Sequence, residues 1–114
     1  MAIAYQDVDQ NLRRVVITGR LDIQGSDEIS IKFAALTSIL ERRVVVDLTA
    51  VSFLASIGIR LIVSGAKALQ RRGGRMVLLV GSDSSVQKTL DSTGIYALIP
   101  IFSDSADADK AALA

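Results

Sequence analysis

The sequence predicts a single α/β domain, with a mixed, mostly parallel β-sheet of about four to five strands and four helices. Short apolar, β-branched runs alternate along the chain with segments of helical spacing, an order typical of strand–helix–strand units. Residues 1–114, half of which are apolar, are enough to bury about two-thirds of the unfolded surface in one core. Since no linker or internal repeat interrupts them, we expect one domain.

The first two predicted strands are Ala2–Val8 and Leu12–Leu21, joined by a turn at Asp9–Asn11. In the second strand, apolar residues alternate with others that include Arg14, Thr18 and Arg20, which is typical of a strand with one face in the core. The short connection predicts an antiparallel hairpin.

The first helix is predicted to begin at Ser26, which can cap it, with Asp27 and Glu28 in the first turn, where the helix dipole favours acids. We expect it to end at residues 41–43. Its core-facing residues recur at steps of four, three and four: Ile29, Phe33, Leu36 and Leu40.

A β-branched run then predicts the central strand, Val44–Leu48, and a loop follows to Phe53 and Leu54. The second helix opens at Ala55 and Ser56 and is stopped by Gly73 and Gly74. Its predicted apolar face consists of Ile59, Ile62, Ala66 and Leu69. Its predicted solvated face consists of Arg60, Ser64, Lys67 and Arg71.

The rest of the chain predicts a strand at Arg75–Val80, a helix at Ser84–Asp91 and a strand at Leu98–Phe102. Pro100 inside the last strand indicates an edge position or an early end. The Ala/Asp-rich segment Ser103–Ala114 is expected either to form a final helix or to fray.

The absent residue types exclude several classes of function. With no cysteine and no histidine, the chain has no thiolate nucleophile, zinc–sulfur site, Ser-His-Asp triad or His-ligated metal. A net charge of +1, with few aromatic residues and no Trp, favours no nucleic acid partner. We therefore expect a protein that is not an enzyme and that uses no cofactor and no metal.

Two further expectations concern location. No uncharged run approaches the ~20 residues that a membrane span needs. The N-terminus has no basic region followed by an apolar core, so we expect no secretory signal and a cytoplasmic protein.

Ser56 is the candidate functional residue, and two interpretations of it are open. Ser is a preferred N-cap, so Ser56 can be an ordinary capping residue. A hydroxyl at a strand-to-helix junction also lies beside free backbone N–H groups, which suits a phosphate. Phosphorylation there would change the charge seen by a partner protein, and would act as a binding switch.

Three segments, Gly19–Asp22, Val46–Leu48 and Val51–Ile59, resemble at this spacing a STAS domain, and more narrowly the bacterial anti-sigma factor antagonists. Gly73–Leu78 and Thr93–Ile95 resemble later parts of the same family. The resemblance implies a STAS-like fold and a role in transcription regulation, including stress responses. The unphosphorylated antagonist binds an anti-sigma factor that is also a serine kinase, and a sigma factor is released. Phosphorylation ends the binding, and a phosphatase, of PP2C type, resets it.

The family motif, Asp-Ser-Ser/Thr-Gly-Leu, implies site residues by position. Ser56 matches the phosphate acceptor, Gly58 the glycine, and Asp22 the acidic residue after the second strand. The chain departs from the motif at Ala55, which replaces the Asp, and at Ile57, which replaces the second hydroxyl. We predict phosphorylation at Ser56 and a partner surface made of Asp22, Ala55, Ser56, Ile57, Gly58 and Arg60.

Alternatives remain open. The chain can be a STAS subunit of another complex, such as a lipid-transport ATPase or a secretion regulator, and bind without phosphorylation. The third alternative is a small enzyme that uses Asp22, Asp47 or Ser56. It ranks last, because the sequence pairs no base with any of these residues. Asp91–Gly94 also carries letters of the phosphorylation motif, but it ends a helix, so we predict a C-cap and turn.

Overall fold

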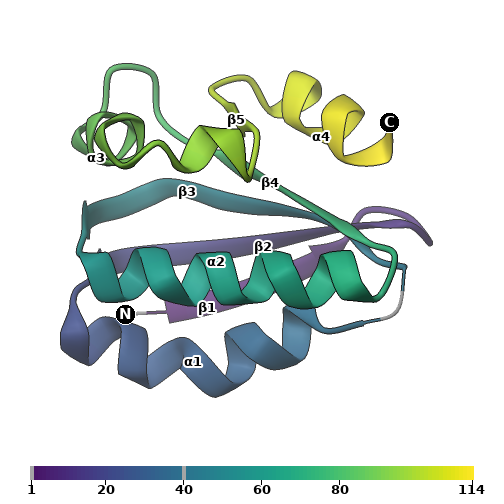
Figure 1. Ribbon diagram of the computed structural model, residues 1–114, viewed down its shortest axis with the longest axis horizontal. Helices are drawn as coiled ribbons and strands as arrows, with labels where there is room; N and C mark the ends of the chain where they lie inside the picture. The colour runs from purple at the N-terminus through teal and green to yellow at the C-terminus, as the bar shows by residue number, and fades with distance from the viewer. Residues whose placement is uncertain (1, 40) are drawn as a thin grey trace.

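The computed structural model describes residues 2–39 and 41–114, which form a five-stranded sheet with helices packed on both faces (Figure 1). The strands are β1 (Ala2–Asp7), β2 (Leu12–Leu21), β3 (Arg43–Leu54), β4 (Arg75–Leu79) and β5 (Ile101–Phe102). The helices are α1 (Ile23–Thr37), α2 (Ser56–Arg71), α3 (Ser85–Thr93), the 3-10 helix η1 (Ile95–Ala97) and α4 (Ser105–Leu113).

The strands lie in the sheet in the order in which they occur along the chain. β1 pairs antiparallel with β2, and every later neighbouring pair is parallel. The predicted mixed, mostly parallel sheet with four α-helices is therefore confirmed, and so is the opening hairpin. The final segment also forms a helix, α4, whose start is capped by the Asp104 side chain.

Alternation along the central strands divides the core into two layers. On one face, Val44 and Val46 of β3 pack in a cluster that includes Phe33 of α1 and Ile62 of α2. On the other face, Val45 packs with a smaller cluster that includes Ala108 of α4. Because β3 is covered on both faces, it reads as a continuous apolar run. Figure 1 shows α1 and α2 side by side on the face opposite α4.

The N-cap of the first helix lies four residues earlier than predicted, so the prediction of Ser26 as its cap is wrong. Asp22 occupies the N-cap position, and its Oδ1 accepts a hydrogen bond from the N–H of Gly25 at 2.8 Å. Asp and Ser are equally good caps, so local propensity does not separate them. Ser26 is instead buried in the helix, and its hydroxyl has no hydrogen-bond partner among the described residues.

Helix α1 also ends earlier than predicted, at Thr37. Ile29, Phe33 and Leu36 are buried as expected, whereas Leu40, the fourth member of the predicted apolar row, lies outside the described residues.

The central strand is longer than predicted, since β3 continues to Leu54 where a loop was expected. The reason is pairing with β2, which resumes at Thr18 opposite Ala50 and ends at Leu21 opposite Leu54. Two register shifts interrupt the pairing, one between Val16 and Thr18 and one between Gly19 and Arg20. Gly19, at the second shift, has a φ of +99°, a left-handed conformation that favours glycine.

The last strand is shorter than predicted, because only Ile101 and Phe102 pair with β4. Residues 98–100, the first part of the predicted strand, form an irregular turn that follows η1. Pro100 has no N–H to donate, but its carbonyl accepts a hydrogen bond from the N–H of Leu78 at 2.9 Å. The proline therefore lies just before β5, which is at the edge of the sheet, so the edge position that Pro100 indicated is confirmed.

Candidate functional site

The candidate site lies where two neighbouring parallel strands end and the two long helices begin. Leu21 of β2 pairs with Leu54 of β3, and the N–H of Ala55 donates to the carbonyl of Leu21 at 2.9 Å. The next residues along the two chain segments are Asp22 and Ser56. The starts of α1 and α2 accordingly lie at the same end of the molecule, on the left in Figure 1. The structure thus brings together the residues that the family motif implied.

Asp22 uses its carboxylate to hold the start of α1. Besides the hydrogen bond from Gly25, the carboxylate lies 3.6 Å from the Nε of Arg20. The backbone N–H of Gly25, and secondarily Arg20, lower the pKa of Asp22 below its usual range. A carboxylate that is ionised and committed in this way is a poor general base.

Ser56 is not the N-cap of α2, so its interpretation as a capping serine is wrong. Ala55 has the extended backbone of the cap, φ −90° and ψ 166°, and it provides no side-chain hydrogen bond. Ser56 is the exposed first residue of the helix, and its hydroxyl forms no hydrogen bond with another described residue. The first amides of a helix have no acceptor within it, so this end of α2 presents free N–H groups beside the hydroxyl.

Gly58 fixes how closely α2 approaches the sheet. A Cβ at this position would lie 3.0 Å from the Cβ of Leu21 and 3.1 Å from the carbonyl oxygen of Leu21. Gly58 is buried, so it contributes to the site by placing the start of α2 against the end of β2. Direct contact of Gly58 with a partner stays a prediction.

Ile57 and Arg60 point into a groove between α1 and α2, with a volume of about 510 Å³. Ile57 is 40% exposed, and Arg60 is exposed one turn further along the helix. Ile23, 78% exposed at the start of α1, lines the opposite wall. The predicted partner residues therefore border a partly apolar surface that includes residues from both helices.

Sequence reasoning missed Phe53 and Ile23 as parts of this surface. Phe53 is 41% exposed at the end of β3, and the Arg20 guanidinium lies over its ring, 4.4 Å from the centroid. A cation over an aromatic face is favourable, most of all away from water. For Phe53 a signal was present, because it belongs to the segment Val51–Ile59 that carries the family resemblance. Ile23 lies one residue beyond the segment Gly19–Asp22, so the resemblance did not point to it.

The remaining chemical candidates are not gathered at this site. Asp47 lies seven residues before Leu54 on β3, roughly 20 Å along an extended strand, and its carboxylate accepts hydrogen bonds from Thr49. Residues 2–39 and 41–114 contain no cluster of acidic side chains that could hold a metal ion. No described helix is both long and apolar enough to cross a bilayer.

The Asp91–Gly94 segment ends α3 as predicted. Gly94 occupies the C-cap with a φ of +72°, and its N–H donates to the carbonyl of Asp91. The segment therefore closes a helix, whereas Ser56 begins one.

A model of the STAS domain family matches residues 5–108 of the chain. The search of curated proteins found no match to this chain. Among solved structures, an anti-sigma factor antagonist from Mycobacterium paratuberculosis has a TM-score of 0.86 at 18% identity, covering 99% of this chain and 94% of its own. An anti-sigma-factor antagonist (STAS) domain protein from Planctomyces limnophilus has a TM-score of 0.80 at 24% identity, with 96% of each chain covered.

The Bacillus cell fate determinant SpoIIAA, an anti-sigma factor antagonist, is also similar in its phosphorylated form. The TM-score is 0.69 at 19% identity, covering 96% of this chain and 99% of that one. At these identities the structural similarity establishes the fold.

Proposed function

The chain belongs to the STAS domain family, and we propose that it is an anti-sigma factor antagonist, switched by phosphorylation of Ser56. The observation that carries the proposal is the state of Ser56, an exposed hydroxyl at the start of α2 with no capping role. Antagonists among its structural neighbours, one of them solved in a phosphorylated form, support the same role. The partner is an anti-sigma factor with serine kinase activity, and the role requires the cytoplasm.

The chain is a substrate in the proposed reaction, and the kinase provides the catalytic groups. The Ser56 oxygen attacks the γ-phosphorus of ATP, the bond to the β-phosphate oxygen breaks, ADP leaves, and the serine proton passes to a kinase base. A PP2C-type phosphatase reverses the modification with water, releasing inorganic phosphate and restoring the hydroxyl.

Phosphate at Ser56 adds about −1.5 to −2 charges and three acceptor oxygens. The free amides and the positive end of the α2 dipole accommodate this charge within the fold. Ala55 contributes as well, because the family's Asp at this position would repel the phosphate, and alanine does not. The added charge therefore acts mainly on the partner, by weakening the binding of a surface that packs on the neutral Ser56 hydroxyl among Asp22, Ile57 and Arg60.

The direct test is binding of the unmodified chain and two variants to the candidate kinase, encoded nearby. Ser56→Asp is expected to weaken binding by at least ~1.4 kcal/mol, about tenfold, while Ser56→Ala binds constitutively. Ser85→Asp is the matched control, because Ser85 is likewise the exposed first residue of a helix, α3, and it should bind like wild type. Equal binding of all four proteins would rule out a switch at Ser56.

A second candidate function is a binding subunit of another complex, such as a lipid-transport ATPase or a secretion regulator. The departures at Ala55 and Ile57 favour it, because a phosphorylation-independent module needs neither motif residue. Under this alternative, the chain co-purifies with membrane ATPase subunits, and the Ser56 variants leave that association unchanged.

A further inference from the structure

A continuous groove runs along the seam between α1 and α2. Its N-terminal half, the 510 Å³ cavity described above, is lined by Ile23, Asp27 and Ser30 of α1 and by Ile57, Leu61 and Ser64 of α2. A second cavity of about 250 Å³ continues it and shares Leu61 and Ser64 with the first. Ala34, Ala35 and Ala68 line this second half. With α1 fifteen residues long, the groove extends over roughly 22 Å, enough for about four turns of a helix.

The walls of the groove favour a large apolar ligand surface. Ile23 and Ile57 stand at one end with 78% and 40% of their surface exposed, and Ile31 on the adjacent face of α1 is 85% exposed. Small residues at the other end allow a backbone to approach closely. Gly65 deepens the seam, since a Cβ there would lie 2.7 Å from the Phe33 ring and force α1 and α2 apart. A groove with large side chains at one end and small ones at the other can accept the ridge of side chains on a third helix.

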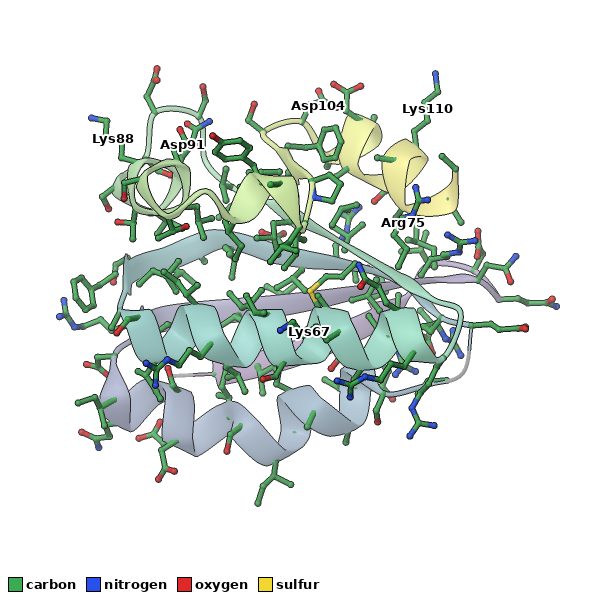
Figure 2. The ribbon with its side chains drawn as sticks, in the orientation of Figure 1. Lys67, Arg75, Lys88, Asp91, Asp104 and Lys110 are labelled. Carbon is green, nitrogen blue, oxygen red and sulfur yellow. The ribbon has the colours of Figure 1, made fainter. Side chains whose placement is uncertain are left out.

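The charge on the α2 wall defines the occupant further. Helix α2 contains Arg60, Lys67 and Arg71 and no acidic residue. These three are exposed and recur at steps of seven and four, so they form one row along α2. Arg60 lines the groove itself, and the row continues from it toward the C-terminal end of the helix. None of the ion pairs formed by the described residues includes any of them. Figure 2 shows Lys67 midway along α2. Asp27 is the acidic residue in the groove lining on α1.

We propose that this groove is a docking site for an acidic amphipathic helix of a partner protein. Aliphatic residues of the partner at i, i+3, i+4 and i+7 fill the seam, with the largest at the Ile23–Ile57 end. Asp and Glu on the flank of that helix pair with Arg60, Lys67 and Arg71. The inference goes beyond the proposed function and does not rest on it, because it needs neither a kinase nor phosphate on Ser56.

The test is selection from a displayed library of randomised helical peptides of about fifteen residues, with the unphosphorylated chain as bait. Enriched peptides are expected to carry the aliphatic spacing and a net negative charge, and to bind more weakly as salt rises. Ser64→Trp fills the groove at an exposed position shared by both cavities and should weaken binding at least tenfold. Lys67→Glu should weaken it several-fold and reduce its salt dependence.

Gln70→Trp is the matched control, because Gln70 is exposed on the same helix but faces a different cavity, beside Pro100. It should leave peptide binding unchanged. The proposal is overturned if no peptide of this type is enriched, or if the enriched peptides bind Ser64→Trp as tightly as wild type. It is also overturned if the chain is a dimer that Ser64→Trp dissociates, since the groove then belongs to a second copy. Failure here leaves the Ser56 test unaffected, and failure of the Ser56 test leaves this one unaffected.

Discussion

Helices α1 and α2 begin at adjacent strand ends, yet their first turns are held in different ways. Helix α1 is held locally, by the Asp22 carboxylate on the N–H of Gly25. Helix α2 has Ala55 at the cap and no side-chain acceptor, and is held by packing of Gly58 against Leu21 and by its buried face. The helix that lacks a cap is also the one that begins with the exposed Ser56. Because packing stabilises this first turn and no side chain caps it, its free amides stay available to the phosphate that we propose.

Breaking the packing of α2 should have the largest effect. Gly58→Val places side-chain carbon where a Cβ alone would lie 3.0 Å from both Leu21 and Leu54. We expect the free energy of unfolding in urea to fall by about 1–3 kcal/mol, as for other overpacked sites. Gln70→Val, at an exposed position on the same helix, controls for the cost of a β-branched residue in a helix. Equal losses for the two variants would contradict the role assigned to Gly58.

Ala55→Asp sharpens the comparison by giving α2 the kind of cap that α1 has. The new carboxylate can accept from the free amides of the first turn, and the free energy of unfolding should rise by about 1 kcal/mol. Ala106→Asp, in the exposed first turn of the already capped α4, is the control for added charge near a helix start, and should give a smaller gain. An unchanged stability would mean that the first turn of α2 is already satisfied.

Lowering the pH should reduce the stability that the Asp22 cap gives to the start of α1, whereas the start of α2 has no titrating cap to lose. The pKa of Asp22 is lowered in the folded chain, chiefly by the hydrogen bond from Gly25. Its contribution to stability is therefore complete above the ordinary pKa of an aspartate, about pH 4, and is lost as pH falls through the lowered value. Asp22→Asn keeps a capping oxygen that does not titrate, so urea unfolding of this variant should depend less on pH below about pH 4.

Asp7 also loses an interaction in acid, because the hydrogen bond from Arg13 lowers its pKa. Its contribution is present in wild type and in Asp22→Asn alike, so the difference between the two proteins isolates Asp22. Parallel pH profiles for the two would show that the Asp22 carboxylate contributes nothing as an ion.

Ser56→Ala should have the smallest effect on stability. Since the Ser56 hydroxyl forms no hydrogen bond with another described residue, we expect the free energy of unfolding to change by less than about 0.5 kcal/mol. Ser84→Ala, which removes a hydroxyl that accepts from the N–H of Gln87 and caps α3, should cost about 1 kcal/mol. A loss at Ser56 equal to that at Ser84 would show that Ser56 is a cap after all.

The predictions that succeeded depend on periodicity and on strong local signals. Apolar spacing predicted the buried face of α2, and Gly94 predicted the end of α3, because each signal lies within the element that it describes. The start of α1 was mispredicted because Asp22 and Ser26 are both good caps. The length of β3 was mispredicted because residues 50–54 are stabilised by pairing with β2, which no local pattern encodes.

In the candidate site, too, some features could be predicted from the sequence, whereas others depend on contacts between distant segments. The family resemblance placed Asp22 and Ser56 together, and the paired ends of β2 and β3 bring them there. The groove between α1 and α2 was not predicted, because its walls come from two helices whose separation is set by contacts such as Gly65 with Phe33. The stacking of Arg20 on Phe53 was missed because it depends on the register after a bulge.

The most direct test of the account is the intact mass of the protein isolated from its own cells, grown under several stresses, with mapping of any modified residue. The account predicts a species heavier by about 80 Da, one phosphoryl group, located on Ser56 and changing in abundance with stress. Ser56 unmodified in every condition, with the protein held in a stable complex, would contradict the switch.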